Sequence, residues 1–197
     1  MRCYHLCNMY ISGLMAGLQS AHTQHELAIK YLASTPYRNL AGDESMNEYG
    51  ARLDDFHDAK ASYIDWANNH KTLILLNGGM MSHLLEIEAF LAENKHILAW
   101  ASFREEEDAL NGALTNVGLV LPEYMYAFSR QVLAFVDGGD GFAKVYLGVS
   151  QGQIDFERKA GTEVINAVHY SHTGSTAYVY TPFDIELLRK LDRLKLM

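Results

Sequence analysis

The acidic segment FREEEDALNGALT is the first candidate for chemistry, because four carboxylates stand in a row beside neutral polar groups. A carboxylate can take a proton from water and so activate that water for attack on a carbonyl carbon. We therefore select Glu106, Glu107 and Asp108 as candidate bases. Asn111 and Thr115 could position the water or the carbonyl. The competing interpretation is a solvated acidic turn, in which Thr115 only satisfies the end of a strand.

The segment ISGLMAGLQSAHTQHE, residues 11–26, is typical of a turn from a strand into a helix. Such an entrance presents free backbone N–H groups and the positive end of the helix dipole, which can hold a carbonyl or phosphate oxygen without a cation. Ser12 and Gly13 would let a ligand approach this backbone closely. Within the helix, Gln19 and His22 are candidates for binding a substrate, and their alternative role is to tie the helix to the sheet.

The histidines and cysteines near the N-terminus are the next candidates. His22 and His25 have a spacing that allows two metal ligands on one helical face, with Glu26 adjacent. No third ligand is evident and no His-Glu-x-x-His order occurs, so we predict no metal site and no cofactor. Cys3 and Cys7 are the two cysteines of the chain, and their spacing on a predicted strand is too long for an easy disulfide. We expect buried, reduced thiols.

Alternating strands and helices must position these residues. Apolar alternation predicts strands at 3–11, 71–79, 96–103 and 114–121. Helical spacing predicts helices at 14–33, across 51–69 and at 80–95. This order is typical of an α/β domain with helices on a mixed or parallel sheet.

The pattern changes after Tyr124, and we place a domain boundary between residues 125 and 126. Short strands or hairpin arms are predicted at 130–136, 143–149, 163–170 and 175–181, with a hairpin turn at 137–141. Residues 182–197 predict a closing amphipathic helix with Pro182 in its first turn. This β-rich extension could cover a sheet edge, cap a crevice or make a homodimer contact.

Composition indicates a globular protein. Apolar residues make up 49% of the 197 residues, charged residues 20%, and there are three prolines. The net charge of −8 arises entirely in residues 1–125, which hold 8 Lys and Arg against 16 Asp and Glu. An acidic domain is at a disadvantage with nucleic acid unless a basic patch offsets it. No apolar run reaches membrane-spanning length and no signal-peptide pattern occurs, so we expect a cytoplasmic protein without membrane association.

Two segments together resemble the type II peptidyl-tRNA hydrolases. The helix entrance GLMAGLQSAHT places Gln19, Ser20, Ala21 and His22 in that family's helix pattern. A Trp followed by a strand that begins near a Lys is matched by Trp66, Lys71 and residues 72–76. The end of the family's pattern is matched by Gly112, Thr115 and Pro122.

The resemblance implies a three-layer α/β/α fold on a four-stranded mixed sheet over residues 1–125. It also implies an active-site crevice between Ser12–Gln19 and Glu106–Thr115. Two departures lie in this crevice. The family's two lysines at the helix entrance are replaced by Gly13 and Met15, and its Asp-Ala-Gly-x-Thr turn is replaced by FREEEDALN.

Two function hypotheses follow from the resemblance. The first is a protein that binds, or hydrolyses, the ester of a peptidyl- or N-blocked aminoacyl-tRNA, gripping the tRNA 3′ end with residues 12, 13, 15, 19, 22, 111 and 112. The second is a catalytically inactive binding or regulatory module of the same fold, with its acidic surface turned to a protein partner or a small ligand.

A third hypothesis comes from two short motifs, His70-Lys71-Thr72 and His169-Tyr170-Ser171. Paired His-x-Thr/Ser motifs are typical of the two-histidine phosphoesterases, which cleave cyclic or 2′-linked phosphates. Such tripeptides arise easily by chance in a chain with nine histidines, and the order of the surrounding elements fits the hydrolase resemblance better.

Overall fold

The computed structural model of the protein describes residues 1–33, 58–93, 98–127, 129–130, 132–133, 144–146, 164–166 and 182–197. The chain divides into two compact units. The first is Met1–Pro122 together with Leu194–Met197, and the second is Glu123–Arg193. The first unit contains the helix entrance and the acidic segment.

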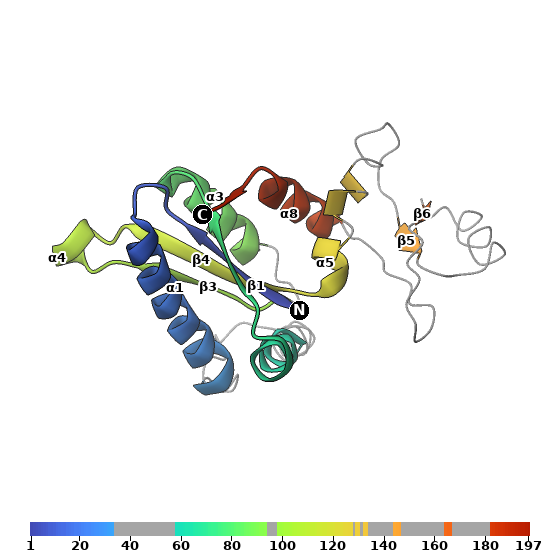
Figure 1. Cartoon of the computed structure of the whole chain (residues 1–197), viewed down its shortest axis with the longest axis horizontal. Coiled ribbons are helices and arrows are strands. Elements are labelled where there is room, and N and C mark those ends of the chain that lie inside the picture. Colours follow the sequence, from blue (N-terminus) through green and yellow to red (C-terminus); the bar gives the residue numbers. More distant parts are fainter. Residues whose placement is uncertain are drawn as a thin grey trace, which may run out of the picture. The chain divides into compact units, whose positions relative to one another are not determined.

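A mixed sheet forms the centre of the first unit (Figure 1). In spatial order its described strands are β3 (Trp100–Arg104), β4 (Leu114–Leu121), β1 (Arg2–Cys7), β2 (Leu73–Asn77) and β7 (Lys195–Leu196). β1 and β2 are parallel, and the other neighbouring pairs are antiparallel. The predicted α/β class with a mixed sheet is therefore confirmed.

The sheet has five strands in the described residues, where four are predicted. The additional strand is β7, which pairs antiparallel with β2. The leucine spacing of residues 182–197 predicts one continuous helix, but the helix ends at Asp192 and two of the last residues extend to pair with β2. Backbone pairing to a sheet edge, which the side-chain pattern does not encode, decides this difference.

Two long helices accompany the sheet (Figure 1). α1 (Gly13–Ala28) continues as the π-helical turn η1 (Ile29–Ala33) and contacts β3 and β4. α3 (Met81–Glu93) contacts β4, and the short helix α4 (Glu107–Leu110) connects β3 to β4. Residues 58–65 are helical and continue as η3 (Trp66–His70). The three predicted helices are confirmed in their described parts; residues 51–57 and 94–95 lie outside these parts.

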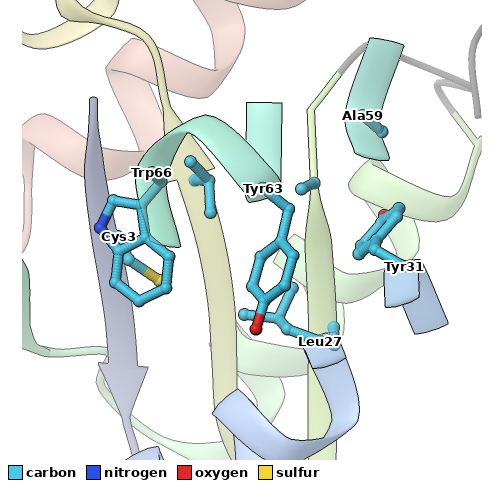
Figure 2. Close-up of a cluster of buried hydrophobic side chains, with 9 residues drawn as sticks. Cys3, Leu27, Tyr31, Ala59, Tyr63 and Trp66 are labelled. Atoms are coloured by element: carbon cyan, nitrogen blue, oxygen red, sulfur yellow. The ribbon is translucent and has the colours of Figure 1, made fainter. Parts of the chain in front are cut away.

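A cluster of aromatic and small apolar side chains joins α1, the helix at 58–70 and the sheet (Figure 2). Its members are Cys3, Leu27, Tyr31, Ala59, Tyr63, Trp66, Ala99, Ala101 and Val120. The ring centroids of Tyr63 lie 6.0 Å from Tyr31 and 5.9 Å from Trp66, which is the range of favourable tilted aromatic pairs. The Trp66 indole donates a hydrogen bond to the Thr72 carbonyl oxygen (2.9 Å), so the cluster also holds the start of β2.

The second unit differs from its prediction. It contains α5 (Glu123–Ala127), β5 (Lys144–Tyr146), β6 (Val164–Asn166) and α8 (Pro182–Asp192). The two strands are predicted as such, but they pair in parallel, so they are not adjacent arms of a hairpin. Residues 130, 132 and 133 are helical, so a strand there is wrong, because a short apolar run does not distinguish helix from strand. The predicted turn at 137–141 and the strand at 175–181 lie outside the described residues.

Candidate active site

The entrance of α1 lies at the carboxyl ends of the parallel strands β1 and β2. The backbone N–H of Gly78 donates to the Cys7 carbonyl (2.7 Å), and that of Met9 donates to the Gly79 carbonyl (2.8 Å). These bonds hold the two strand-to-helix connections side by side. In α/β sheets, ligands commonly bind outside the carboxyl ends of parallel strands, so this edge is where a site is expected.

Ser12 caps the N-terminus of α1. Its hydroxyl accepts a hydrogen bond from the backbone N–H of Met15 (3.3 Å). Apart from Gly13, its two chain neighbours and the adjoining backbone of α1, no heavy atom of the described residues lies within 4 Å of the position that a Cβ would take on Gly13. The backbone at this residue is therefore open among the described residues. Ser12, Gly13 and Met15, all predicted to bind substrate, are exposed here.

Gln19, Glu105 and Thr115 form a polar group between α1 and the β3–β4 connection. The Gln19 amide donates a hydrogen bond to Oε1 of Glu105. The Thr115 hydroxyl lies 3.5 Å from both Oε1 of Gln19 and the Phe103 carbonyl, two long contacts that it shares. Gln19 and Thr115 are each 2% exposed, whereas Glu105 is half-buried. The structure therefore brings the two predicted residues together and joins one of them, Gln19, to a carboxylate that reaches solvent.

His22 lies one helical turn beyond Gln19, on the exposed side of α1. Its ring stacks on Phe103, with ring centroids 4.6 Å apart and planes 12° from parallel. This contact holds the imidazole of His22 close to the acidic run, because Phe103 stands two residues before Glu105. His22, a predicted substrate-binding residue, is thus held at the border of the polar group, and its role there stays a prediction.

The predicted bases Glu106, Glu107 and Asp108 are exposed at the start of α4. Within the described part of the chain, Glu105 is the acid of this run that contacts Gln19. The Glu107 carboxylate instead lies over Gly112, where an added Cβ would stand 2.9 Å from its Oε1.

The turn that follows α4 needs two residues with positive φ. Asn111 has φ 50° and ends α4, and Gly112 has φ 65°. Asparagine and glycine adopt this left-handed conformation more readily than other residues. The backbone N–H of Glu105 then donates to the Ala113 carbonyl (3.0 Å), which closes the connection. Asn111 and Gly112 therefore shape the turn that presents the acidic run.

A second polar network lies deeper, between β1 and α1. The Gln24 amide donates to Nε2 of His5 (2.6 Å), which leaves the ring proton on Nδ1 to donate to Oδ1 of Asn116 (2.9 Å). The Asn116 amide lies 3.3 Å from the Ser20 hydroxyl and 3.2 Å from the Cys7 sulfur. In the described residues every buried side-chain nitrogen and oxygen has a hydrogen-bond partner.

Burial determines the charge state of this deeper network. Desolvation lowers the pKa of His5 to about 4, and the hydrogen bond that His5 donates to Asn116 offsets part of this effect. Burial raises the pKa of Cys3 to about 12, against a smaller lowering by the Gln24 hydrogen bond. Both groups are therefore neutral near pH 7, and the free, buried thiols of Cys3 and Cys7 agree with the prediction. This network ties α1 to the sheet.

Gly118 allows α1 to approach the sheet closely. A Cβ at this position would stand 2.8 Å from Cγ2 of Thr23 and 3.0 Å from Cε1 of His5. Residues 19 and 115 can meet across the interface because the backbone of β4 has no side chain at 118.

The outward side of the α1 entrance is apolar. Leu14 is 86% exposed and Tyr10 is 74% exposed, and Leu18 is half exposed. Glycine and methionine stand at 13 and 15, where the resembled family has lysines. The entrance therefore offers backbone N–H groups and apolar side chains.

Sequence reasoning missed the specific role of Glu105 and the whole His5–Asn116 network. Glu105 belongs to the acidic run, but nothing in four consecutive acids distinguishes the one that faces α1. His5 alternates with Cys3 and Cys7 on one strand, a polar residue among buried positions, and this is the signal that could have indicated a buried partner.

The remaining predicted sites can be placed briefly. His70 ends η3 and pairs with Asp65 (3.2 Å), so it lies on a helix end and not on a strand, and the His169 motif lies outside the described residues. No group of three or more His, Cys, Asp or Glu side chains in the described ranges is arranged to hold a metal ion. None of the described helices has the length and apolar character needed to cross a membrane.

Three comparisons with known proteins were made. Neither the protein-family models, nor the curated proteins, nor the solved structures include a match to this chain.

Proposed function

We propose that the protein is a type II peptidyl-tRNA hydrolase-like esterase, which binds and cleaves the ester of a peptidyl- or N-blocked aminoacyl-tRNA. The observation that supports this proposal is the contact between Gln19 and Glu105, with Thr115 beside Gln19. It brings a carboxylate, an amide and a hydroxyl together at the crevice implied by the resemblance.

We assign the role of general base to Glu105. Oε1 of this carboxylate is held by the Gln19 amide, and the half-buried side chain reaches solvent, where Oε2 can take a proton from a water. The resulting hydroxide attacks the ester carbonyl carbon, the bond to the ribose oxygen breaks, and the proton passes to that oxygen. The reaction consumes one water and breaks one ester bond. The proton that Glu105 takes from the water passes to the ribose oxygen, so the reaction balances without a cofactor.

Gln19 and Thr115 act as positioning residues in this proposal. Thr115 lies within reach of Oε1 of Gln19, so it favours the amide orientation in which the Gln19 nitrogen faces Glu105. The free N–H groups at Gly13 and Leu14 would hold a carbonyl or phosphate oxygen of the substrate. That role replaces the lysines of the resembled family with backbone dipoles.

The three-layer α/β/α arrangement belongs to the same proposal. Adjacent residues of a strand point to opposite faces of a sheet. Asn116 bonds Ser20 of α1, whereas Ser102, the partner of Val117 in the β3–β4 pairing, bonds Glu88 of α3. We infer from this alternation that α1 and α3 form the two outer layers.

The test is hydrolysis of an N-acetyl-aminoacyl-tRNA by the purified full chain. We expect Glu105→Gln to lower the rate by about 10²- to 10⁴-fold, the usual effect of losing a general base. Thr115→Val should lower it by about tenfold, corresponding to one lost hydrogen bond.

Two carboxylate controls sharpen this test. Glu86→Gln removes an exposed carboxylate of α3 and should leave the rate unchanged. Glu107→Gln decides between Glu105 and the acids of α4, and a larger loss at Glu107 would overturn the assignment of the base. Failure of the folded wild-type protein to bind or cleave the substrate would overturn the esterase proposal and favour the inactive binding module.

A further inference from the structure

Two long stretches of the chain carry no charge, and both lead into helices at the same edge of the sheet. Residues 3–25 contain no Asp, Glu, Lys or Arg, and neither do residues 72–85. They include the connections from β1 to α1 and from β2 to α3, which the hydrogen bond from Met9 to Gly79 (2.8 Å) joins. A stretch of this length without charged side chains is unusual in a chain whose net charge is −8.

This edge exposes large apolar side chains, which we call the entrance surface. Its members are Met9, Tyr10, Leu14, Met15, Leu18 and Met80. Leu14 and Leu18 are one helical turn apart on α1, so their side chains lie on the same side of the helix. An exposed group of this kind, in place of scattered single residues, is a mark of a binding surface. Methionine is flexible and polarizable, so three methionines suit contact with a peptide of variable sequence.

The acids of α4 begin next to α1, the helix that carries Leu14, Met15 and Leu18 of the entrance surface. The contact between Gln19 and Glu105 places the start of α4 next to α1. Glu106, Glu107 and Asp108 follow Glu105 and are exposed, and none of the three has an ion-pair partner among the described residues. Leu110, at the end of α4, is also exposed. The entrance surface and the acids next to it therefore combine exposed apolar side chains with carboxylates that have no ion-pair partner among the described residues.

We propose that the entrance surface binds a cationic amphipathic segment of a partner protein, with apolar side chains on Leu14 and Leu18 and Lys or Arg beside Glu106, Glu107 and Asp108. Charge complementarity selects this occupant. A nucleic acid laid across these apolar side chains would bring phosphates toward three carboxylates and meet no Lys or Arg from residues 3–25 or 72–85. The tRNA 3′ end of the proposed function is assigned to the backbone N–H groups of Gly13 and Leu14, and not to the side chains of the entrance surface. A second copy of the entrance surface would bring the same neutral and acidic groups, although exposed Lys195 of β7 lies beside Asn77 at this edge of the sheet. The proposal does not rest on ester hydrolysis.

The test uses labelled model peptides of about five helical turns. The first peptide has leucines on one face and lysines on the other, the second has glutamates in place of the lysines, and the third has serines in place of the leucines. Fluorescence anisotropy with the full chain measures their affinity at about 50 mM and about 300 mM NaCl. We expect the first peptide to bind at least tenfold more tightly than the other two, with an affinity that falls as salt rises.

Variants of the protein locate the binding. Leu14→Ser with Leu18→Ser should weaken binding of the first peptide at least tenfold, whereas Leu32→Ser, at a leucine near the end of η1 that is about as exposed as Leu18, should leave its affinity unchanged. Glu106→Gln, Glu107→Gln and Asp108→Asn together should weaken binding and reduce its salt dependence. The peptide series tests the charge requirement even where a variant folds poorly.

Four outcomes would overturn the proposal. They are equal binding of the glutamate peptide, equal loss in the Leu32→Ser control, tight binding of a single-stranded RNA ending in CCA that the Leu14 and Leu18 changes abolish, and a dimer that the same changes dissolve. The last two would assign the surface to RNA or to a second copy of the chain.

Discussion

α1 and α3 follow parallel neighbouring strands, yet α1 buries polar side chains as well as the apolar Ala16 and Leu27, whereas the buried side chains of α3 are apolar. α3 buries Leu84, Ile87 and Leu91, as an amphipathic helix is expected to. α1 buries Gln19, Ser20 and Thr23 near its middle and exposes Leu14 and Leu18. A buried polar group and an exposed apolar group are the two informative exceptions to the usual pattern, and α1 shows both.

By this difference, α3 is a helix that stabilises the sheet, whereas α1 is a helix that presents the candidate site. α3 contributes by burying apolar surface. α1 is held by a hydrogen-bonded network, which fixes its distance and rotation more narrowly than apolar contact does. The carboxylate of Glu105 requires such a fixed position of α1, because the Gln19 side chain of α1 holds it. Because polar side chains occupy the buried face of α1 near its middle, the apolar side chains of Leu14 and Leu18 lie on the exposed face.

The largest expected effect is the contrast between Leu84→Ala and Leu14→Ala. Leu84 is fully buried in α3, so its truncation should cost about 2–5 kcal/mol of unfolding free energy. Leu14 is 86% exposed, so the same change should alter stability by less than about 0.5 kcal/mol. Urea denaturation measures both. Equal losses would mean that α1 is packed as α3 is.

The network of α1 should also give the protein a pH-dependent stability. Burial holds the pKa of His5 at about 4 in the folded protein, below its ordinary value of 6.5. Between pH 6.5 and pH 4 the unfolded chain takes up a proton that folded His5 refuses, so stability falls as the pH falls through this window. The difference corresponds to a loss of about 3 kcal/mol.

Urea midpoints at pH 7 and near pH 4 measure this loss. His5→Gln should remove most of it, whereas His83→Gln, an exposed residue of α3, should leave it in place. If the two variants lose the same stability between these pH values as the wild type, His5 is not the group responsible.

Asn116→Ala should have the next largest effect. It removes a partner of His5, Ser20 and Cys7 at once and leaves a buried group unsatisfied, at a cost of about 1–3 kcal/mol. Asn69→Ala serves as the matched control, because that amide bonds Asp65 on the exposed surface and its loss should cost less than about 0.5 kcal/mol. Thermal or urea unfolding compares the two. A neutral Asn116→Ala would mean that apolar packing alone holds α1.

The smallest effect expected is at the cap of α1. Ser12→Ala removes the side-chain oxygen that accepts from the Met15 N–H, and should cost about 1 kcal/mol. Ser82→Ala, in the exposed first turn of α3, should change stability by less than about 0.5 kcal/mol. Circular dichroism during urea unfolding follows both. A loss at Ser82 equal to that at Ser12 would remove this difference between the two helix starts.

Much of the first unit follows from local pattern. The four main strands and the helices α1 and α3 were each predictable as elements, because apolar spacing of period two or about 3.6 distinguishes strand from helix. For α1 this spacing does not identify the buried face, since Leu14 and Leu18 are exposed. The pairing of β5 and β6 and the strand β7 were not. Pairing depends on which distant backbone lies alongside, and a short apolar segment carries little information about that.

The candidate site was predictable only in part. Gln19 and Thr115 could be selected from the sequence, because the resemblance places both in the family's pattern. Glu105 could not be separated from the three acids that follow it, since consecutive residues in a turn have no period. The partner of His5 could not be predicted from the sequence, because Asn116 lies 111 residues away and meets His5 only through the antiparallel pairing of β1 with β4.

The sequence by itself determined the α/β class, the charge-free stretches, the free cysteines and the acidity of the β3–β4 connection, since these depend on composition and short spacing. Tertiary structure alone decided that α1 turns its polar residues inward and that Glu105 meets Gln19. The physical reason is that a helix can rotate about its own axis. Packing against β4, with Gly118 allowing close approach, selects one rotation of α1 and so decides which of its side chains form the site.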